Sequence, residues 1–322
     1  MGELVRELFL EVFDDPELRR LDDLARLEPA AGGRLGFTTD CHVITPPIFP
    51  GGDIGRLAVC GTVNDLAVGG AEPQALSCGF VLEEGLELAL LERIVRSMKA
   101  AAREAGVRIV AGDTKVVRRG EADRIYITTA GVGWIAAGTA LGPERIRPGD
   151  RLLVSGPVGD HGAAVLDARG ELSMEVGLDS DCRPLASLAR ALLAACGPGL
   201  RAMRDPTRGG LTAVLNEFAR HCGCRLEVEE EAVPVREAVR GVCELLGLDP
   251  FDLPCEGVLL AVVDPAQAGQ ALEVLRSHPD GAHAQLIGEA GRAGEPEVVV
   301  RTPYGGQRLL DQPLGDPLPR IC

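Results

Sequence analysis

The sequence predicts an α/β (α+β) protein of two domains, each a mixed sheet with helices packed on it, followed by an extended flexible C-terminal tail. Stretches of strand periodicity and of helix periodicity alternate along the chain, whose 322 residues are enough for two domains. A polar turn at 147–150 divides these stretches into two blocks. The segment after residue 301 is rich in proline and glycine, which disfavours a helix or a central strand.

The composition bounds the class of protein. Hydrophobic residues make up 46% of the chain and charged residues 25%, which is typical of a globular protein. The net charge of −15 argues against a nucleic-acid partner, because phosphate backbones are bound by basic faces. No apolar run approaches the length of a membrane span, and the first residues do not form a signal peptide, so we expect no membrane association. The ten cysteines include no C-x-x-C pair, which favours a reducing compartment and predicts a cytoplasmic protein.

The first block contains an N-terminal helical segment at 1–35 and a domain at 36–148. Leucines recur at helical spacing over 4–28, which predicts a helix there. The remaining pattern predicts a strand at 35–40, a loop at 45–52, a helix at 54–68, a strand at 74–82, a helix at 88–105, and strands at 107–111 and 125–134. Asp53 is the expected N-cap of the helix at 54–68.

The second block is predicted to form a domain at 149–301, with the tail at 302–322. It opens with a strand at 151–155 and a glycine-rich turn that leads into a helix. Helices near 184–195, 209–220, 235–246 and 266–277 alternate with strands near 224–228, 257–263, 284–288 and 297–301. We therefore expect a second sheet with helices packed against it.

The tail ends on a cysteine, Cys322, and Arg320 lies two residues before it. An extended chain of roughly twenty residues spans about 60 Å, so such a tail reaches far from its own domain. One interpretation is a frayed terminus whose last residue happens to be cysteine. The other is a substrate arm that carries a group on the Cys322 thiol into a site built by the rest of the protein.

Carboxylates gather at the ends of the elements expected in the first block. Asp40 and Asp113 follow strands, Asp53 begins a helix and Asp65 lies late in that helix. Carboxylates that converge need a cation between them, and oxygen ligands favour Mg²⁺. Lys115, one of only two lysines, could reach a phosphate or act as an acid or base. The alternatives are structural: Asp53 as a helix cap and Asp65 as a solvated helix residue.

The second block adds further candidates. Asp205, Thr207 and Arg208 lie just before a predicted helix and are followed by two glycines. This pattern is typical of an anion-binding site at a helix N-terminus. An Asp205–Arg208 ion pair at a capped helix start explains it equally well. Glu256 precedes an apolar strand and is either a partly buried carboxylate with a raised pKa or a solvated turn residue. His161 is a candidate site residue, and the alternative is an ordinary polar histidine on a surface loop. Neither a P-loop nor a dinucleotide fingerprint occurs, so any ATP site is of another type.

Seven stretches, taken together and in order, resemble the HypE family of hydrogenase maturation proteins. These are TTD at 38–40, FPGGDIG at 49–55, CGTVNDLA at 60–67, GDTKVV at 112–117, GDHG at 159–162, RDPTRGG at 204–210 and PRIC at 319–322. The family lies within the PurM-like ATP-binding superfamily of aminoimidazole ribonucleotide synthetase and selenophosphate synthetase. The resemblance runs over nearly the whole chain and implies a PurM-like fold.

The resemblance also implies a homodimer whose N-terminal sheets are joined, with ATP and Mg²⁺ bound between the domains of each subunit. Combined with the candidates above, it assigns ATP binding to Asp53, Asn64, Thr114, Lys115, Asp205, Thr207 and Arg208, and the metal to Asp40, Asp65 and Asp113. Catalysis falls to Cys322, Lys115 and Glu256. The family usually has a glycine-rich segment ahead of the first helix, and the sequence begins near that helix, so we expect weaker ATP affinity if the segment is absent.

The implied activity is a dehydration on the protein's own tail. Cys322 would receive a carbamoyl group from the carbamoyltransferase HypF, and ATP would drive conversion of the S-carboxamide to a thiocyanate. The cyanide would then pass to the iron of [NiFe]-hydrogenase on a HypC–HypD scaffold complex. Glu256 is the first choice of base and Lys115 the second. Two rivals remain: a small-molecule kinase or selenophosphate-synthetase-like enzyme, which would not need Cys322, and a non-catalytic maturation adaptor.

Overall fold

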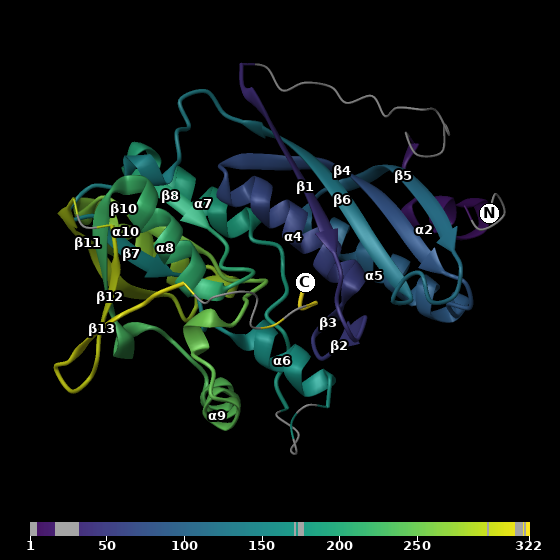
Figure 1. Ribbon diagram of the computed structural model, residues 1–322. Coiled ribbons are helices and arrows are strands. Elements are labelled where there is room, and N and C mark those ends of the chain that lie inside the picture. The colour runs from purple at the N-terminus through teal and green to yellow at the C-terminus, as the bar shows by residue number, and fades with distance from the viewer. Residues whose placement is uncertain are drawn as a thin grey trace.

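Two sheets on opposite sides of the molecule, with helix α4 (Ile54–Val68) between them, form the frame of this computed structural model (Figure 1). It describes residues 5–16, 32–170, 172, 177–294, 296–312, 318 and 320–322. One sheet has four strands and the other seven, and helices pack on both. The predicted α/β fold class is therefore confirmed.

The four-stranded sheet has the strand order β1-β6-β4-β5. Its strands are β1 (Arg34–His42), β4 (Ala71–Glu83), β5 (Arg108–Val117) and β6 (Ile125–Ile135). Only the β4–β5 pair is parallel. Helices α4 and α5 (Leu88–Ala105) cover one face of this sheet, and a two-stranded ladder of β2 (Ile48–Phe49) and β3 (Gly52–Asp53) precedes α4.

Helix α4 begins where the sequence predicts. The Asp53 carboxylate accepts hydrogen bonds of 2.9 Å from the main-chain N–H groups of Gly55 and Arg56, which satisfies two donors at the helix start. A Cβ at Gly55 would lie 2.5 Å from the carbonyl oxygen of Ile94 in α5, so only glycine lets the two helices approach this closely. The helix is buried along most of its length, because the second domain packs on the side that the sheet leaves open.

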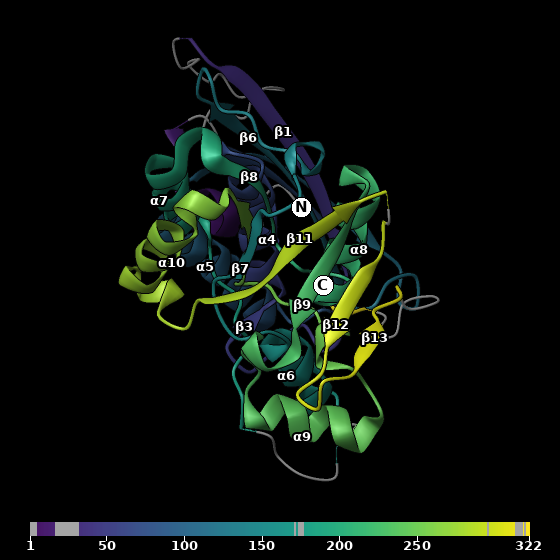
Figure 2. The same cartoon turned by 90° about the vertical axis from the view of Figure 1, so that its left-hand side faces the viewer.

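The seven-stranded sheet has the order β13-β12-β9-β11-β7-β10-β8. Its strands are β7 (Arg151–Val154), β8 (Leu200–Arg204), β9 (Cys224–Glu229), β10 (Leu260–Val263), β11 (Gln285–Ala293), β12 (Val298–Arg301) and β13 (Gln307–Leu309). Figure 2 shows β11, β9, β12 and β13 side by side. The helices of this half are α6 (Asp160–Ala168), α7 (Ala186–Cys196), α8 (Gly210–Cys222), α9 (Glu237–Leu246) and α10 (Ala268–Ser277).

Short elements complete the described chain. A π-helix at Val5–Leu10 continues into α2 (Glu11–Phe13), and short 3-10 helices lie at Pro143–Arg145, Gly197–Gly199, Glu230–Ala232, Pro250–Asp252, Pro265–Gln267 and Pro279–Gly281. The helix predicted at 4–28 is interrupted after Phe13, where Asp14 takes a left-handed conformation with a φ of +49°. Its residues 17–28 lie outside the described residues, as do Pro313, Pro317 and Pro319 of the tail. None of the helices within the described ranges combines the length and the apolar character needed to cross a bilayer.

Three details of the prediction are corrected. Asp40 and Asp113 do not follow strands but lie inside β1 and β5, because pairing with β6 and β4 continues past both residues. Strand β8 was not predicted. The tail was expected to begin at residue 302, but Gln307–Leu309 instead pairs with β12 at the edge of the second sheet.

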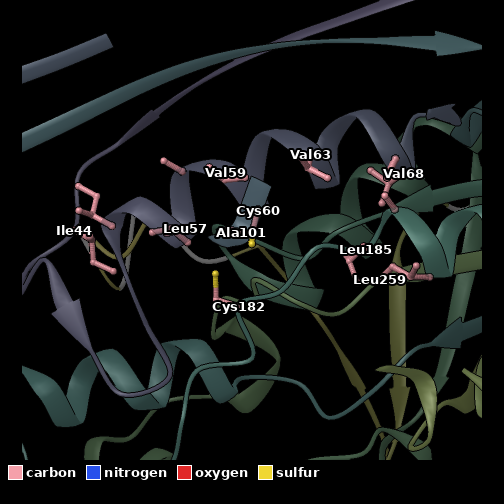
Figure 3. Packing of buried hydrophobic residues seen from close by; sticks show 14 of the residues in the cluster. Ile44, Leu57, Val59, Cys60, Val63, Val68, Ala101, Cys182, Leu185 and Leu259 are labelled. Atoms are coloured by element: carbon pink, nitrogen blue, oxygen red, sulfur yellow. The ribbon is translucent and has the colours of Figure 1, made fainter. Parts of the chain in front are cut away.

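One hydrophobic core spans both halves of the molecule. Figure 3 shows Val59, Cys60 and Val63 of α4 beside Cys182, Leu185 and Leu259 of the second half. These side chains belong to a single cluster of buried residues. The two sheets are therefore held in a fixed relation by shared apolar burial as well as by the chain connection.

Candidate functional site

Three carboxylates from three elements meet between the two sheets. Asp40 of β1 accepts a 2.7 Å hydrogen bond from the Thr62 hydroxyl, and Asp65 of α4 accepts one of 2.9 Å from the Thr38 hydroxyl. Burial raises the pKa of Asp65, and the negative charge of Asp40 raises it further. Burial, with Asp65 second, also raises the pKa of Asp205 to about 7. The sequence predicted these residues separately, and the structure brings them together.

Glu256 adjoins this acidic cluster of Asp40, Asp65 and Asp205. Only 2% of the residue is exposed, and its Oε1 atom is buried without a hydrogen-bond partner in the described chain. Burial raises its pKa well above the usual value, and Asp205 contributes the largest charge effect. The buried interpretation of Glu256 is therefore correct.

The cluster fits a divalent cation. Burial and a neighbouring carboxylate raise the pKa values of Asp65 and Asp205, and a buried oxygen of Glu256 beside them has no partner in the described chain, so a hard cation would stabilise the group. No three His, Cys, Asp or Glu side chains within the described ranges are already arranged to hold a metal ion. Mg²⁺ commonly takes one or two protein carboxylates and completes its shell with water and nucleotide phosphates, so this donor set suits Mg²⁺ with a bound nucleotide.

Asp113 and Lys115 do not join the cluster within one chain. They form an exposed ion pair of 2.9 Å on the edge strand β5, and Lys115 lowers the pKa of Asp113. Asp113 is aligned with Gly79, Thr128 and Cys41 across the sheet, three strand spacings or about 14 Å from β1. Because side chains alternate along a strand, this row faces away from α4, whereas Asp40 faces towards it. The predicted metal set of Asp40, Asp65 and Asp113 is corrected accordingly.

Two predicted ATP-binding residues have structural roles. Asp53 caps α4, about 18 Å along the helix axis from Asp65. Asn64 is fully buried, and its amide nitrogen donates to the carbonyl oxygens of Arg183 at 3.1 Å and Glu256 at 3.2 Å. Its amide oxygen accepts from the N–H of Leu185 at 2.7 Å. Since these bonds use both amide hydrogens, we now expect Asn64 to join the two halves rather than to contact ATP.

The loop before α8 is built on two glycines. Gly209 and Gly210 have φ values of +75° and +58°, and a Cβ at Gly210 would lie 2.6 Å from the carbonyl oxygen of Leu253. Only glycine can therefore start α8 here. Beside this helix start, Thr207 is half-buried and Arg208 is exposed. The arginine whose charge lowers the pKa of Asp205 is Arg204. The Asp205–Arg208 pair considered from the sequence is thus not the arrangement found.

A cleft of about 640 Å³ opens between the two halves next to the cluster. Thr38 and Asp65 line it from the first half, and Arg204, Phe218 and His221 from the second. A nucleotide-sized ligand fits a volume of this order. Phe218 and His221 are not recognisable from the sequence as lining residues, because both lie on a helix face whose partner depends on how the halves are joined.

The end of the tail is docked between the halves rather than extended (Figure 1). The N–H groups of Val43 and Thr45 donate to the carbonyl oxygens of Cys322 at 3.1 Å and Arg320 at 3.3 Å. Ile321, between them, is 2% exposed, and the Arg320 side chain pairs with Asp123. The described end therefore departs from the predicted far-reaching arm, because its main chain finds partners just beyond β1.

His161 contacts the docked tail directly. Its Nε2–H donates to the carbonyl oxygen of Ile321 at 2.8 Å, which leaves Nδ1 to accept from the Ser180 hydroxyl at 2.8 Å. The ring is fully buried, and burial lowers its pKa to about 4. His161 is thus a neutral, oriented donor and not the surface residue that the sequence left as an alternative.

Raising the pH from 6.5 to about 8 is expected to lower the melting temperature of protein kept free of divalent cations. The raised pKa of Asp205 contributes stability that is present below its unfolded value of 3.8 and is lost as the pH rises through about 7. His42 and His161, whose pKa values are lowered to about 4, contribute stability that is lost as the pH falls from about 6.5 through 4. Above pH 6.5 they oppose the effect of Asp205 only by the part of the unfolded imidazole that is still protonated. Differential scanning fluorimetry checks this.

Two controls sharpen the measurement. Mg²⁺ should offset much of the loss at the higher pH, and Asp205→Asn should flatten the slope of the melting temperature with pH. A melting temperature that rises between pH 6.5 and about 8 would show that the acidic cluster does not carry the repulsion assigned to it.

Comparison with known proteins identifies the family. Residues 21–135 match the model of the AIR synthase related protein N-terminal domain, and residues 147–301 match that of its C-terminal domain. The chain is 52% identical over 326 residues to "Carbamoyl dehydratase HypE" of Rhodobacter capsulatus, covering 100% of this chain and 95% of the relative. A crystal structure of "Hydrogenase Maturation Protein HypE in complex with ATP" is 47% identical, with a TM-score of 0.95 and coverage of 100% and 96%.

A second solved structure adds a partner. The chain in the "HypE-HypF complex" is 43% identical, with a TM-score of 0.84, and the match covers 96% of this chain and 99% of that one. The curated relative named above is an enzyme by its name. This chain therefore belongs to the HypE family of hydrogenase maturation enzymes, within the PurM-like, AIR synthase related superfamily.

Proposed function

We propose that this chain is an ATP-dependent carbamoyl dehydratase that converts an S-carboxamide on its own Cys322 to a thiocyanate, as a source of cyanide for the iron of [NiFe]-hydrogenase. The observation that carries the proposal is the docked tail. The Cys322 carbonyl is bonded to Val43, only three residues beyond Asp40 of the acidic cluster. A tail end docked just beyond the strand that carries Asp40 supports a substrate role for Cys322 rather than a frayed end.

The chemistry follows from the poor leaving ability of an amide oxygen. Attack of the carboxamide oxygen on the γ-phosphorus of ATP releases ADP and lets that oxygen leave as phosphate. Both amide protons must also be lost for the C≡N bond to form, and Glu256 takes them in turn and passes them to solvent or phosphate. Mg²⁺, held by Asp40, Asp65 and Asp205, would offset charge on the phosphoryl group and on the cluster. A cation there would also lower the pKa of Glu256 and so prepare it as a base.

We place ATP in the cleft between the halves, with its phosphates towards the loop before α8. Thr207, Arg208 and the N-terminus of α8 offer donors for anionic oxygens there. The 47% identical relative solved in complex with ATP supports this placement. A nucleotide bound there would present its phosphates to the acidic cluster and to the donors at the start of α8.

We assign Asp113, Thr114 and Lys115 to a homodimer. The face of the four-stranded sheet opposite α4 carries exposed Leu35 and Phe37, which are 58% and 66% exposed, together with the Asp113–Lys115 pair. Joining two such sheets would bury these apolar side chains. Lys115 would then serve a phosphate only through the partner subunit, which ranks it behind Glu256 as a base.

The proposed function also implies partner proteins and a cellular compartment. HypF is the proposed carbamoyl donor enzyme, supported by the solved complex of a 43% identical HypE. A HypC–HypD complex is the proposed acceptor of cyanide. None of the ten cysteines, all within the described ranges, forms a disulfide, which supports action in the reducing cytoplasm. We also propose 36–148 and 149–301 as the domain limits, with β13 as an edge strand added to the second domain and the tail after it.

Intact mass spectrometry tests the proposal. The protein is incubated with the carbamoyltransferase and carbamoyl phosphate, with and without Mg-ATP. We expect the gain of one carbamoyl group, followed by the loss of one water only with Mg-ATP. If a carbamoyltransferase proven on another acceptor leaves no adduct, the small-molecule kinase or the adaptor becomes the better account. An adduct that never loses water would favour the adaptor.

A further inference from the structure

The structure points to α6 as a clamp for the tail, with His161 and Arg169 as positioning residues for the dehydration step. His161 lies in the first turn of α6 and donates to the carbonyl oxygen of Ile321. Arg169, the C-cap of the same helix, donates from Nε to the carbonyl oxygen of Thr45 at 2.9 Å and from Nη2 to that of Arg320 at 2.6 Å. The two ends of one helix therefore hold two successive residues of the tail. This inference rests on the proposed function only for its effect on catalysis.

The clamp holds the tail against the first half of the molecule. Ile321 forms an antiparallel bridge with Ile44, and the N–H groups on either side of Ile44 bind the tail's carbonyl oxygens. Arg169 spans this short ladder, because its guanidinium reaches a carbonyl oxygen on each of the two strands. Charged donors make stronger hydrogen bonds than neutral ones, so Arg169 is the strongest polar contact of the ladder.

Every hydrogen bond that the tail receives in the clamp ends on its main chain. Carbonyl oxygens of Arg320, Ile321 and Cys322 accept them, while the Ile321 side chain fills a buried site. Such contacts do not depend on what the Cys322 sulfur carries. The same clamp therefore fits the thiol, the S-carboxamide and the thiocyanate, which lets the tail dock before and after each chemical step.

The neutral state of His161 makes its contact constant over the working pH range. Ser180 occupies its second nitrogen, and Phe49 packs edge-on against the ring at 5.4 Å. Arg169 is the charged residue that acts on it from the far end of α6. The clamp is thus a fixed positioning device rather than a pH switch.

Alkylation of Cys322 measures docking without any activity. Iodoacetamide is applied in short pulses, and peptide mass spectrometry follows Cys322 relative to the same peptide in unfolded protein. Arg169→Ala is expected to raise the Cys322 rate about tenfold, the change for losing one charge-assisted hydrogen bond. Arg103→Ala, an exposed arginine in the last turn of α5, is the matched control. Equal Cys322 rates in the two variants would overturn the clamp.

Conservative variants separate positioning from a general loss of structure. Arg169→Lys keeps one strong donor and should recover part of the protection, and His161→Gln should recover more than His161→Ala. In single turnovers of carbamoylated protein, Arg169→Ala should slow the loss of water about tenfold, while the carbamoylation rate stays unchanged. If wild-type protein protects Cys322 but never loses water, the proposed function fails and the clamp stands. If alkylation changes but the water-loss rate does not, the catalytic role is refuted.

Discussion

Glu256→Gln is expected to slow the loss of water from the carbamoylated tail at least a thousandfold, while carbamoyl transfer to Cys322 continues. The wild-type carboxyl group is buried, and its Oε1 has no hydrogen-bond partner within the described chain, so it is available to a substrate proton. A positioned general base contributes about 10²–10⁴-fold, and this reaction must remove two protons. Rapid-quench mass spectrometry with Mg-ATP measures the rate.

The substitution should leave the fold in place. The main-chain bonds of Glu256 to Asp181 and Asn64 do not use its side chain, and glutamine has nearly the same shape. Glu273→Gln, on the exposed side of α10, is the matched control. A Glu256→Gln protein with wild-type dehydration would remove Glu256 as the base and bring Lys115 forward.

Cys322→Ala is expected to abolish the carbamoyl adduct completely. Cys60 and Cys182 are buried between the two halves, so a partner enzyme cannot reach their thiols. Burial raises the pKa of Cys255 well above its usual value, which disfavours its reactive thiolate form. Cys41 is the exposed competitor, but it lies on the far face of the first sheet. Intact mass after incubation with the carbamoyltransferase and carbamoyl phosphate checks the loss.

The paired variant is Cys41→Ala, which should accept one carbamoyl group as the wild type does. An adduct on Cys322→Ala that disappears in the double variant would place the acceptor at Cys41. That outcome would contradict the tail as substrate and leave its docking without a chemical purpose.

Residues close to each other in sequence were easier to assign than those joined by sheet order. Asp53 as a helix cap follows from its position before an apolar run, and the structure confirms it. Asp40, Asp65 and Asp205 were each recognised from local motifs, but their meeting depends on how α4 packs between the two halves. The local sequence pattern identifies these residues, but it does not give the distances between their carboxylates.

The sequence did not predict on which side of the sheet Asp113 and Lys115 of β5 lie. The order β1-β6-β4-β5 places Asp113 and Lys115 on an edge strand, facing away from Asp40. Their expected place assumed that the strand ended before Gly112, but it continues to Val117. One wrong strand end moved two residues to the wrong place.

The docking of the tail could not be predicted from the sequence, for a different reason. Its partners are the N–H groups of Val43 and Thr45 and a buried histidine far away in sequence, and main-chain bonds of this kind leave no residue signature. A proline-rich composition describes the isolated segment and not the surface that receives it.

The contacts that Asn64 makes across the two halves determine which part of the molecule has to move. Asn64 holds three main-chain groups of the second half, and Arg56 donates to the carbonyl oxygen of Cys182 at 2.8 Å. Opening the halves would break these bonds and expose a continuous core, so the catalyst acts as a rigid frame. Under the proposed function, the docked end at 320–322 is presented to this frame by its own chain, at an effective concentration on the order of millimolar. Turnover in such a system would be first order in protein.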